Sequence, residues 1–267
     1  MIKNFDEYLK KYVRLCIRKG LNVQKGQTVF ISAQPEQFNI VRLATEEAYA
    51  AGAREVITDW NDEVINRLTY LNADEAVFDE YPDYLKVRGD YLTDIGAARL
   101  YILSENPEAL AGVDPNRVMR KTKIRRRTLK HFYEATMSNL VQWCIASVPS
   151  NAWATKVFAG KEQSDAVDAL WEKIFRACRI DENDPLENWD KHIALMKKRA
   201  SIMNSYNFKT LHYKNSIGTD FTVGLAKNYI FEGGSEDTPA GVTFLANIPT
   251  EEIYTAPDRL VAEGKVV

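Results

Sequence analysis

The sequence is poor in cysteine and has no long apolar run. Its 267 residues include three cysteines, Cys16, Cys144 and Cys178, none spaced as a CxxC pair. This argues against a disulfide framework or a cysteine zinc site, and predicts reduced, buried thiols in a cytoplasmic protein. No run approaches the roughly 18 apolar residues of a transmembrane helix. The charged segment 1–8 lacks the apolar core of a signal peptide, so we expect neither export nor a membrane partner.

Neither sign of charge dominates the chain. Lysine and arginine number 35 against 37 aspartates and glutamates, which gives a formal net charge of -2. A dedicated nucleic-acid-binding protein usually carries a basic excess, so we expect no nucleic-acid partner. The hydrophobic share of 45% and the charged share of 27% are ordinary for a globular protein and exclude a disordered or collagen-like chain.

Several common catalytic motifs are missing. The sequence contains no P-loop, no GxGxxG after a strand, no GxSxG and no HExxH. Their absence removes the commonest templates for nucleotide binding, serine hydrolysis and zinc proteolysis.

The hydrophobic pattern is typical of alternating strands and helices. Short apolar runs predict strands at 28–32, 55–58, 98–104 and 141–147, and helical spacing predicts helices at 5–18, 38–51, 64–71, 84–93, 115–137, 164–177 and 186–204. Asp114-Pro115 is a standard helix start, with the aspartate as N-cap and the proline in the first turn. Repeated strand–helix–strand units predict an α/β fold with a mainly parallel sheet flanked by helices.

The last quarter of the chain differs from the rest. Strands are predicted at 211–213, 220–225 and 242–246, joined by glycine-rich connections. We therefore predict two domains, an N-terminal α/β domain over residues 1–195 and a β-rich region over residues 196–267. The second is too short to bury a core alone, so it either docks on the first domain or is incomplete.

Two kinds of side chain suggest sites but have plainer interpretations. A basic stretch runs from Arg117 to Lys130. It fits a phosphate or nucleic-acid contact, but a solvated helix face is the favoured interpretation because the whole chain is not basic. His131, His192 and His212 are far apart, and none has a partner at metal-binding spacing, so each is interpreted as an ordinary surface or core residue.

The adjacent glutamates Glu251 and Glu252 are the strongest chemical signal. They follow a run of mostly small and apolar residues. In an extended segment they point to opposite faces, so at most one faces a given site while the other supports it or acts as a general base. From the residues alone, a charged loop is the competing interpretation.

The whole sequence resembles one metallo-aminopeptidase family. The stretch 247–257, Asn-Ile-Pro-Thr-Glu-Glu-Ile-Tyr-Thr-Ala-Pro, resembles the family's Asn-x-Pro-Thr-Glu-Glu-x-x-Thr-Ala-Pro motif. The stretch 218–225, Gly-Thr-Asp-Phe-Thr-Val-Gly-Leu, is similar to its Gly-Thr-Asp-Leu-x-Val-x-Leu segment. Further matches lie at 46–53, 55–62, 112–115 and 149–154, in the family's order and spacing.

This resemblance implies a cytoplasmic, homodimeric aminopeptidase that releases N-terminal residues from short peptides. Family members use two divalent metal ions, zinc, cobalt or manganese, to activate a shared water. The resemblance implies that Glu251 is a metal ligand and that Glu252 is the catalytic base or supports the ligand. Residues 196–267 then correspond to the incomplete start of the metal-binding catalytic domain.

The sequence departs from the family in one respect. The remaining family ligands, a glutamate, two histidines and an aspartate, lie downstream of the Thr-Glu-Glu motif, as does a catalytic tyrosine. This chain ends at Val267. We therefore expect a truncated chain that binds catalytic metal poorly and has negligible activity alone. The alternative is a non-catalytic α/β binding or dimerisation module.

Overall fold

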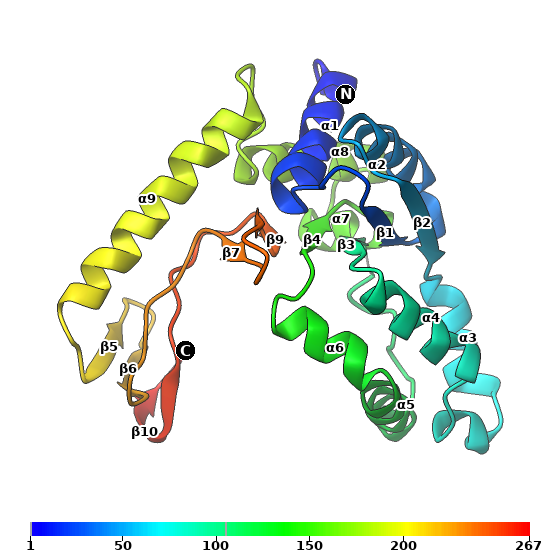
Figure 1. Cartoon of the computed structure of the whole chain (residues 1–267). Helices are drawn as coiled ribbons and strands as arrows, with labels where there is room; N and C mark the ends of the chain where they lie inside the picture. Colours follow the sequence, from blue (N-terminus) through cyan, green and yellow to red (C-terminus); the bar gives the residue numbers. More distant parts are fainter. Residues whose placement is uncertain (1, 105) are drawn as a thin grey trace. The chain divides into compact units, whose positions relative to one another are not determined.

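The computed structural model describes residues 2–104 and 106–267, and the chain divides into two compact units (Figure 1). The first unit consists of Met1–Leu186 and Glu236–Pro249, and the second of Glu187–Ser235 and Thr250–Val267. The predicted domains, residues 1–195 and 196–267, remain a prediction, because the two compact units are defined by packing contacts alone. In the described part of the chain, no helix is both long enough and apolar enough to cross a bilayer.

The first unit is built on a five-stranded sheet. Its strands lie in the order β2-β1-β3-β4-β9, and every neighbouring pair is parallel. The strands are β1 (Thr28–Ala33), β2 (Glu55–Trp60), β3 (Ala98–Leu103), β4 (Trp143–Ser147) and β9 (Asn247–Ile248). The predicted α/β fold with a mainly parallel central sheet is confirmed.

Helices precede the first strand and lie between the later ones, as the βαβ pattern predicts. They are α1 (Phe5–Leu15), continued by a π-helical segment (Cys16–Gly20), α2 (Phe38–Ala50), α3 (Glu63–Asn72), α4 (Asp83–Asp94), α5 (Pro115–Thr128), α6 (Lys130–Met137), α7 (Asn151–Val157) and α8 (Gln163–Ala177), with 3₁₀ turns at Pro35–Gln37 and Glu75–Phe78. Asp114 accepts a hydrogen bond from the backbone N–H of Asn116, so the predicted N-cap of α5 is confirmed.

The predicted single helix over 115–137 is wrong. The helix breaks at Leu129, whose backbone leaves the helical region and whose side chain is buried. The turn lets α6 pack against α4. It also places the Phe132 carbonyl and the Thr136 hydroxyl of α6 where the Arg99 side chain donates to them. Helical periodicity continues through this point in the sequence, and only the tertiary packing interrupts it.

The core of the first unit combines apolar strands with one buried charge. β1 is buried along almost its whole length, as expected for a central parallel strand. The Arg99 guanidinium of β3 is buried and donates to the Phe132 carbonyl at 3.1 Å and to the Thr93 hydroxyl at 2.8 Å. It also lies 3.7 Å from the centre of the Phe132 ring. The three cysteines are free and buried, as predicted.

The segment before Glu251 departs from the predicted strand at 242–246. Only β8 (Thr243–Phe244) falls there, paired with β7 (Glu236–Asp237). The next residues form β9, which adds to the main sheet beside β4 through the pairs Ile145–Asn247 and Ala146–Ile248. β9 has only two residues and lies far along the chain from its partner strand β4. The local sequence therefore carries no signal for this pairing.

The second unit contains most of the long helix α9 (Pro185–Ser205) and an antiparallel sheet in the order β10-β6-β5. The strands are β5 (Thr210–Lys214), β6 (Asp220–Leu225) and β10 (Pro257–Lys265), so the predicted strands at 211–213 and 220–225 are found. A small core forms against α9, where Trp189, Met196 and Phe231 are buried.

Candidate functional site

The Thr-Glu-Glu segment is irregular and open to solvent. Residues 250–253 belong to no helix or strand, and they follow β9 directly in the chain. Both glutamates are exposed, and the side chain of Glu251 keeps 56% of its accessible surface. Solvent access of this kind suits side chains that must meet a ligand, but it does not by itself assign a role.

A buried histidine of α9 holds this segment. His192 is 7% exposed, and its Nε2 lies 2.8 Å from the carbonyl oxygen of Thr250. Because a carbonyl oxygen can only accept, this nitrogen carries the proton and donates it. The Oε2 atom of Glu251 lies 3.6 Å from the same nitrogen, and Trp189 packs edge-on against the imidazole ring at 5.3 Å.

Glycines allow a second segment of the chain to lie against the site. A Cβ atom on Gly233 would stand 2.8 Å from the carbonyl oxygen of Glu252 and 3.3 Å from the Cα of Ile253. Gly234 has a φ of +97° and lies against the turn of α9 at Ile193. The glycine pair therefore fits between α9 and the Thr-Glu-Glu segment, where a larger residue would displace the backbone.

Hydrogen bonds fix the chain just before the glycine pair. Glu232 and Tyr254 exchange two backbone hydrogen bonds of 2.9 and 3.0 Å. The Asn204 side chain donates to the Phe231 carbonyl at 2.9 Å and accepts from the Phe231 N–H at 2.7 Å. The Thr-Glu-Glu segment is thus supported by two other segments, α9 and residues 231–234.

The two carboxylates have different partners. Glu251 lies near the His192 imidazole, whereas the Oε2 atom of Glu252 accepts a hydrogen bond from the backbone N–H of Glu251 at 2.9 Å. The roles of Glu251 as metal ligand and of Glu252 as catalytic base remain predictions.

The residues present do not make up a metal site. Within residues 2–104 and 106–267, no group of three or more histidine, cysteine, aspartate or glutamate side chains is placed to hold a metal ion. His192 uses its near nitrogen to donate, so that atom offers no lone pair to a cation. Glu251 and Glu252 are then part of a ligand set at most, and two metal ions need more donors than this.

The other sequence candidates lie apart from these glutamates in their contacts. The Nε2 atom of His131 lies 3.0 Å from Asp94, and that of His212 lies 2.7 Å from Asp220, all with exposed side chains. His192 was interpreted from sequence as an ordinary residue. Nothing local connects it with Thr250, 58 positions away, so its role in the site was missed.

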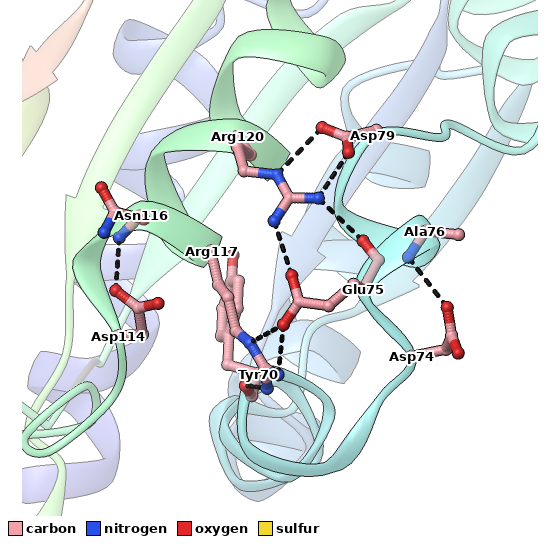
Figure 2. A network of polar contacts seen from close by, with 9 residues as sticks. All are labelled: Tyr70, Asp74, Glu75, Ala76, Asp79, Asp114, Asn116, Arg117 and Arg120. Atoms are coloured by element: carbon pink, nitrogen blue, oxygen red, sulfur yellow. Dashed lines mark hydrogen bonds and ion pairs between the residues drawn. The ribbon is translucent and has the colours of Figure 1, made fainter.

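Much of the basic stretch is used inside the first unit. Arg117 and Arg120 of α5 both bind the Glu75 carboxylate, and Arg120 also binds Asp79 (Figure 2). Hydrogen bonds, from Arg120 first and then from Arg117, lower the pKa of Glu75. The same kind of bond from Arg120 lowers the pKa of Asp79. These ion pairs favour a structural interpretation over nucleic-acid contact.

Comparison with known proteins extends over nearly the whole chain. It is 41% identical to aminopeptidase PepS of Streptococcus thermophilus over 267 residues, and 37% identical to aminopeptidase T of Thermus thermophilus over 262 residues. These matches cover 100% and 98% of this chain but only 64% of each relative. The solved structure of wild-type AmpT from Thermus thermophilus matches with a TM-score of 0.89 at 35% identity, covering 97% of this chain and 64% of that one.

The chain thus spans less than two thirds of the length of these relatives. The sequence profile of the thermophilic metalloproteases, family M29, matches residues 5–267. The predicted family resemblance is confirmed, and with the fold in agreement, the chain belongs to the M29 family of thermophilic metalloproteases.

Proposed function

We propose that this chain is the N-terminal part of a metal-dependent aminopeptidase that releases N-terminal residues from short peptides. In the complete catalytic unit, Glu251 supplies one carboxylate to a pair of divalent ions, zinc, cobalt or manganese. Glu252 acts as the catalytic base or supports that ligand. When bound, the ions supply Lewis-acid chemistry and an activated water.

One observation supports this proposal above the others. The exposed carboxylate pair is held at a defined place by His192 and by the close backbone approach at Gly233. A charged surface loop needs no such support, because its side chains do not have to be kept in position. The relatives that match over the length of this chain are named aminopeptidases.

On its own, this chain is proposed to bind metal weakly and to hydrolyse peptides negligibly. Titration with zinc or cobalt, followed by equilibrium dialysis, measures affinity and stoichiometry. Hydrolysis of leucine p-nitroanilide measures activity. Two metal ions per chain with a dissociation constant below about 1 μM would contradict the proposal, as would turnover comparable with that of the relatives.

The roles of the two glutamates are tested in a longer protein, made of this chain followed by the C-terminal third of the PepS relative. Glu251→Gln should lower the bound metal, whereas Glu252→Gln should keep the metal and lower kcat by roughly 10²- to 10⁴-fold, as loss of a general base does. Glu263→Gln, on exposed β10, is the matched control. Full metal content and activity in both site variants would refute the assignment.

The family resemblance also leads us to propose a homodimer in the cytoplasm. Free, buried thiols fit a reducing compartment. Light scattering coupled to size-exclusion chromatography measures the assembly directly. A monomer at all concentrations, for the longer protein as well as this chain, would contradict the dimer.

A second candidate function, a non-catalytic binding module, is favoured by a cavity of about 910 Å³ within the first unit. Absence of leucine p-nitroanilide hydrolysis by the longer protein, together with binding of a small molecule, would support it over the peptidase.

A further inference from the structure

The cavity lies at the carboxyl edge of the parallel sheet. Its lining includes Asp59 at the end of β2, Leu103 at the end of β3 and Ser147 at the end of β4. The strand order reverses between β1 and β3, and in open parallel sheets such a reversal leaves a crevice where ligands bind. A volume of about 910 Å³ is within the range of roughly 300–1,000 Å³ of small-molecule sites.

The ion pairs of α5 build one wall of this cavity. Arg117 and Arg120 attach α5 to the 3₁₀ turn Glu75–Phe78, and Arg117 also donates to the Tyr70 carbonyl at 2.6 Å (Figure 2). Lys121 and Arg125 follow Arg117 at intervals of four residues, so all three share one face of the helix. Both Lys121 and Arg125 line the cavity.

Arg125 is a cation of this wall with no carboxylate partner among the described residues, and its guanidinium, unlike the Lys121 ammonium, is not held by backbone carbonyls. Lys121 is engaged, because its Nζ donates to the carbonyls of Val77 at 2.9 Å and Glu80 at 3.1 Å. Arg125 shares a hydrogen bond with the Tyr81 side chain, a neutral partner. Among the residues that the structure describes, no carboxylate lies within ion-pairing distance of Arg125.

Among the described lining residues, Glu63 at the start of α3 supplies a carboxylate of opposite charge. Its Oε2 atom accepts from the Asn106 N–H at 2.9 Å and from the Gln34 side chain at 3.3 Å, so the carboxylate is held in place. No cation from the described part of the chain pairs with it. Asp59, in contrast, is neutralised by Arg88 at 2.6 Å.

The chemistry at this edge disfavours a phosphate. The N-terminal N–H groups of α3, which could bind an anion, already donate to Asp62, at 2.8 Å from Val64 and 3.0 Å from Ile65. The neighbouring Glu63 adds negative charge at the same helix end. A ligand here must therefore offer a cationic group to Glu63 and an anionic group to Arg125, with apolar surface for the lining side chains Leu103 and Trp153.

We propose that this cavity binds a zwitterionic amino acid or short peptide. Its α-ammonium group pairs with Glu63, its carboxylate pairs with Arg125, and its side chains contact Leu103 and Trp153. Binding involves no bond cleavage and no metal ion. The site lies wholly within the first unit, so this inference does not rest on the proposed peptidase function.

Calorimetric titration with L-leucyl-L-leucine in the presence of EDTA tests the proposal. The blocked peptides N-acetyl-leucyl-leucine and leucyl-leucinamide each lack one charge, and each should bind at least about tenfold more weakly, since bonds to charged groups are the strong ones. Inorganic phosphate is the third probe. No heat at millimolar dipeptide, equal binding of the blocked peptides, or binding of phosphate alone would overturn the proposal.

Two variants assign the contacts. Glu63→Gln should reduce dipeptide affinity to that of the N-acetylated form, and Arg125→Gln should reduce it to that of the amide. Glu46→Gln, on exposed α2, and Arg126→Gln, an exposed neighbour on α5, are matched controls outside the lining. Wild-type affinity in both site variants would refute the assignment. Arg125→Gln leaves the hydrogen bonds of Glu63 intact. A loss of dipeptide affinity in this variant therefore cannot come from a disturbed position of Glu63.

Because EDTA removes metal from the Thr-Glu-Glu segment, the outcome is separate from the test of peptidase activity. Dipeptide binding without metal binding would support the cavity proposal alone, and the reverse result would support the peptidase proposal alone.

Discussion

Replacing Gly233 with alanine tests the arrangement around the carboxylate pair most directly. The added methyl group would stand 2.8 Å from the Glu252 carbonyl oxygen, where ordinary contact begins at 3.4 Å. The two atoms must therefore separate by about 0.6 Å, from 2.8 to 3.4 Å. The obstacle is backbone on both sides, so no side-chain rotation can relieve it.

We expect this change to destabilise the second unit by about 1–3 kcal/mol, the usual cost of overpacking. The backbone pairing between Glu232 and Tyr254 lies next to the strained contact and should weaken with it. The carboxylates should then lose their defined position before the first unit is affected.

Fluorine NMR of protein labelled with 5-fluorotryptophan separates the two units during urea unfolding. Trp189 is the tryptophan of the second unit and is buried, whereas Trp171 lies in α8 of the first. Gly233→Ala should lower the unfolding midpoint of Trp189 and leave that of Trp171 unchanged.

Gly89→Ala is the matched control for this experiment. Gly89 lies inside α4, where a Cβ atom would meet only the end of a leucine side chain at 3.0 Å, with the next neighbours at 3.8 Å or beyond. Alanine is also the better helix former by roughly 0.5–1 kcal/mol, so we expect no loss of stability. A Gly233→Ala variant with the wild-type Trp189 signal and midpoint would refute the steric argument.

Three further predictions concern stability. The hydrogen bonds from Arg120 and Arg117 lower the pKa of Glu75 from 4.5, so this carboxylate stabilises the fold above that pH and the effect is lost as the pH falls through its lower native pKa. Glu75→Gln should therefore flatten the acid fall in Tm relative to Glu46→Gln, and parallel melting curves would contradict this. Arg99→Ala should cost about 2–4 kcal/mol in urea unfolding, because it leaves a cavity and removes the three hydrogen bonds that the guanidinium donates; a loss below about 1 kcal/mol, on the order of a surface change, would show that the site collapses. Asn204→Ala should cost about 1–2 kcal/mol by loss of its two hydrogen bonds, seen at the Trp189 signal and absent at Trp171.

The sheet of the first unit could be predicted because its signals are local. Apolar runs such as 28–32 are short and bounded by turn residues, which favours buried strands, and the helical stretches between them favour parallel pairing. The start of α5 at Asp114-Pro115 could be predicted for the same reason, since the signal for this cap lies in two adjacent residues. The break at Leu129 was not readable, because it follows from packing between α6 and α4.

The candidate site was predictable only in part. Glu251 and Glu252 stand out through a motif, so the resemblance located them without any structural information. The support from His192 and the close approach at Gly233 depend on contacts between segments far apart in sequence. Single-sequence patterns do not encode such contacts, and these residues look ordinary until the chain is folded.

The burial of the three thiols has a consequence for how opening of the protein can be followed. Burial raises the pKa of Cys16 and of Cys144, so in the native state both stay protonated as well as shielded, and alkylating reagents react with the thiolate. All three cysteines belong to the first unit. The rate of alkylation in native buffer therefore measures how often the first unit opens. Local opening around Glu251 and Glu252, in the second unit, exposes no cysteine and is not detected by alkylation.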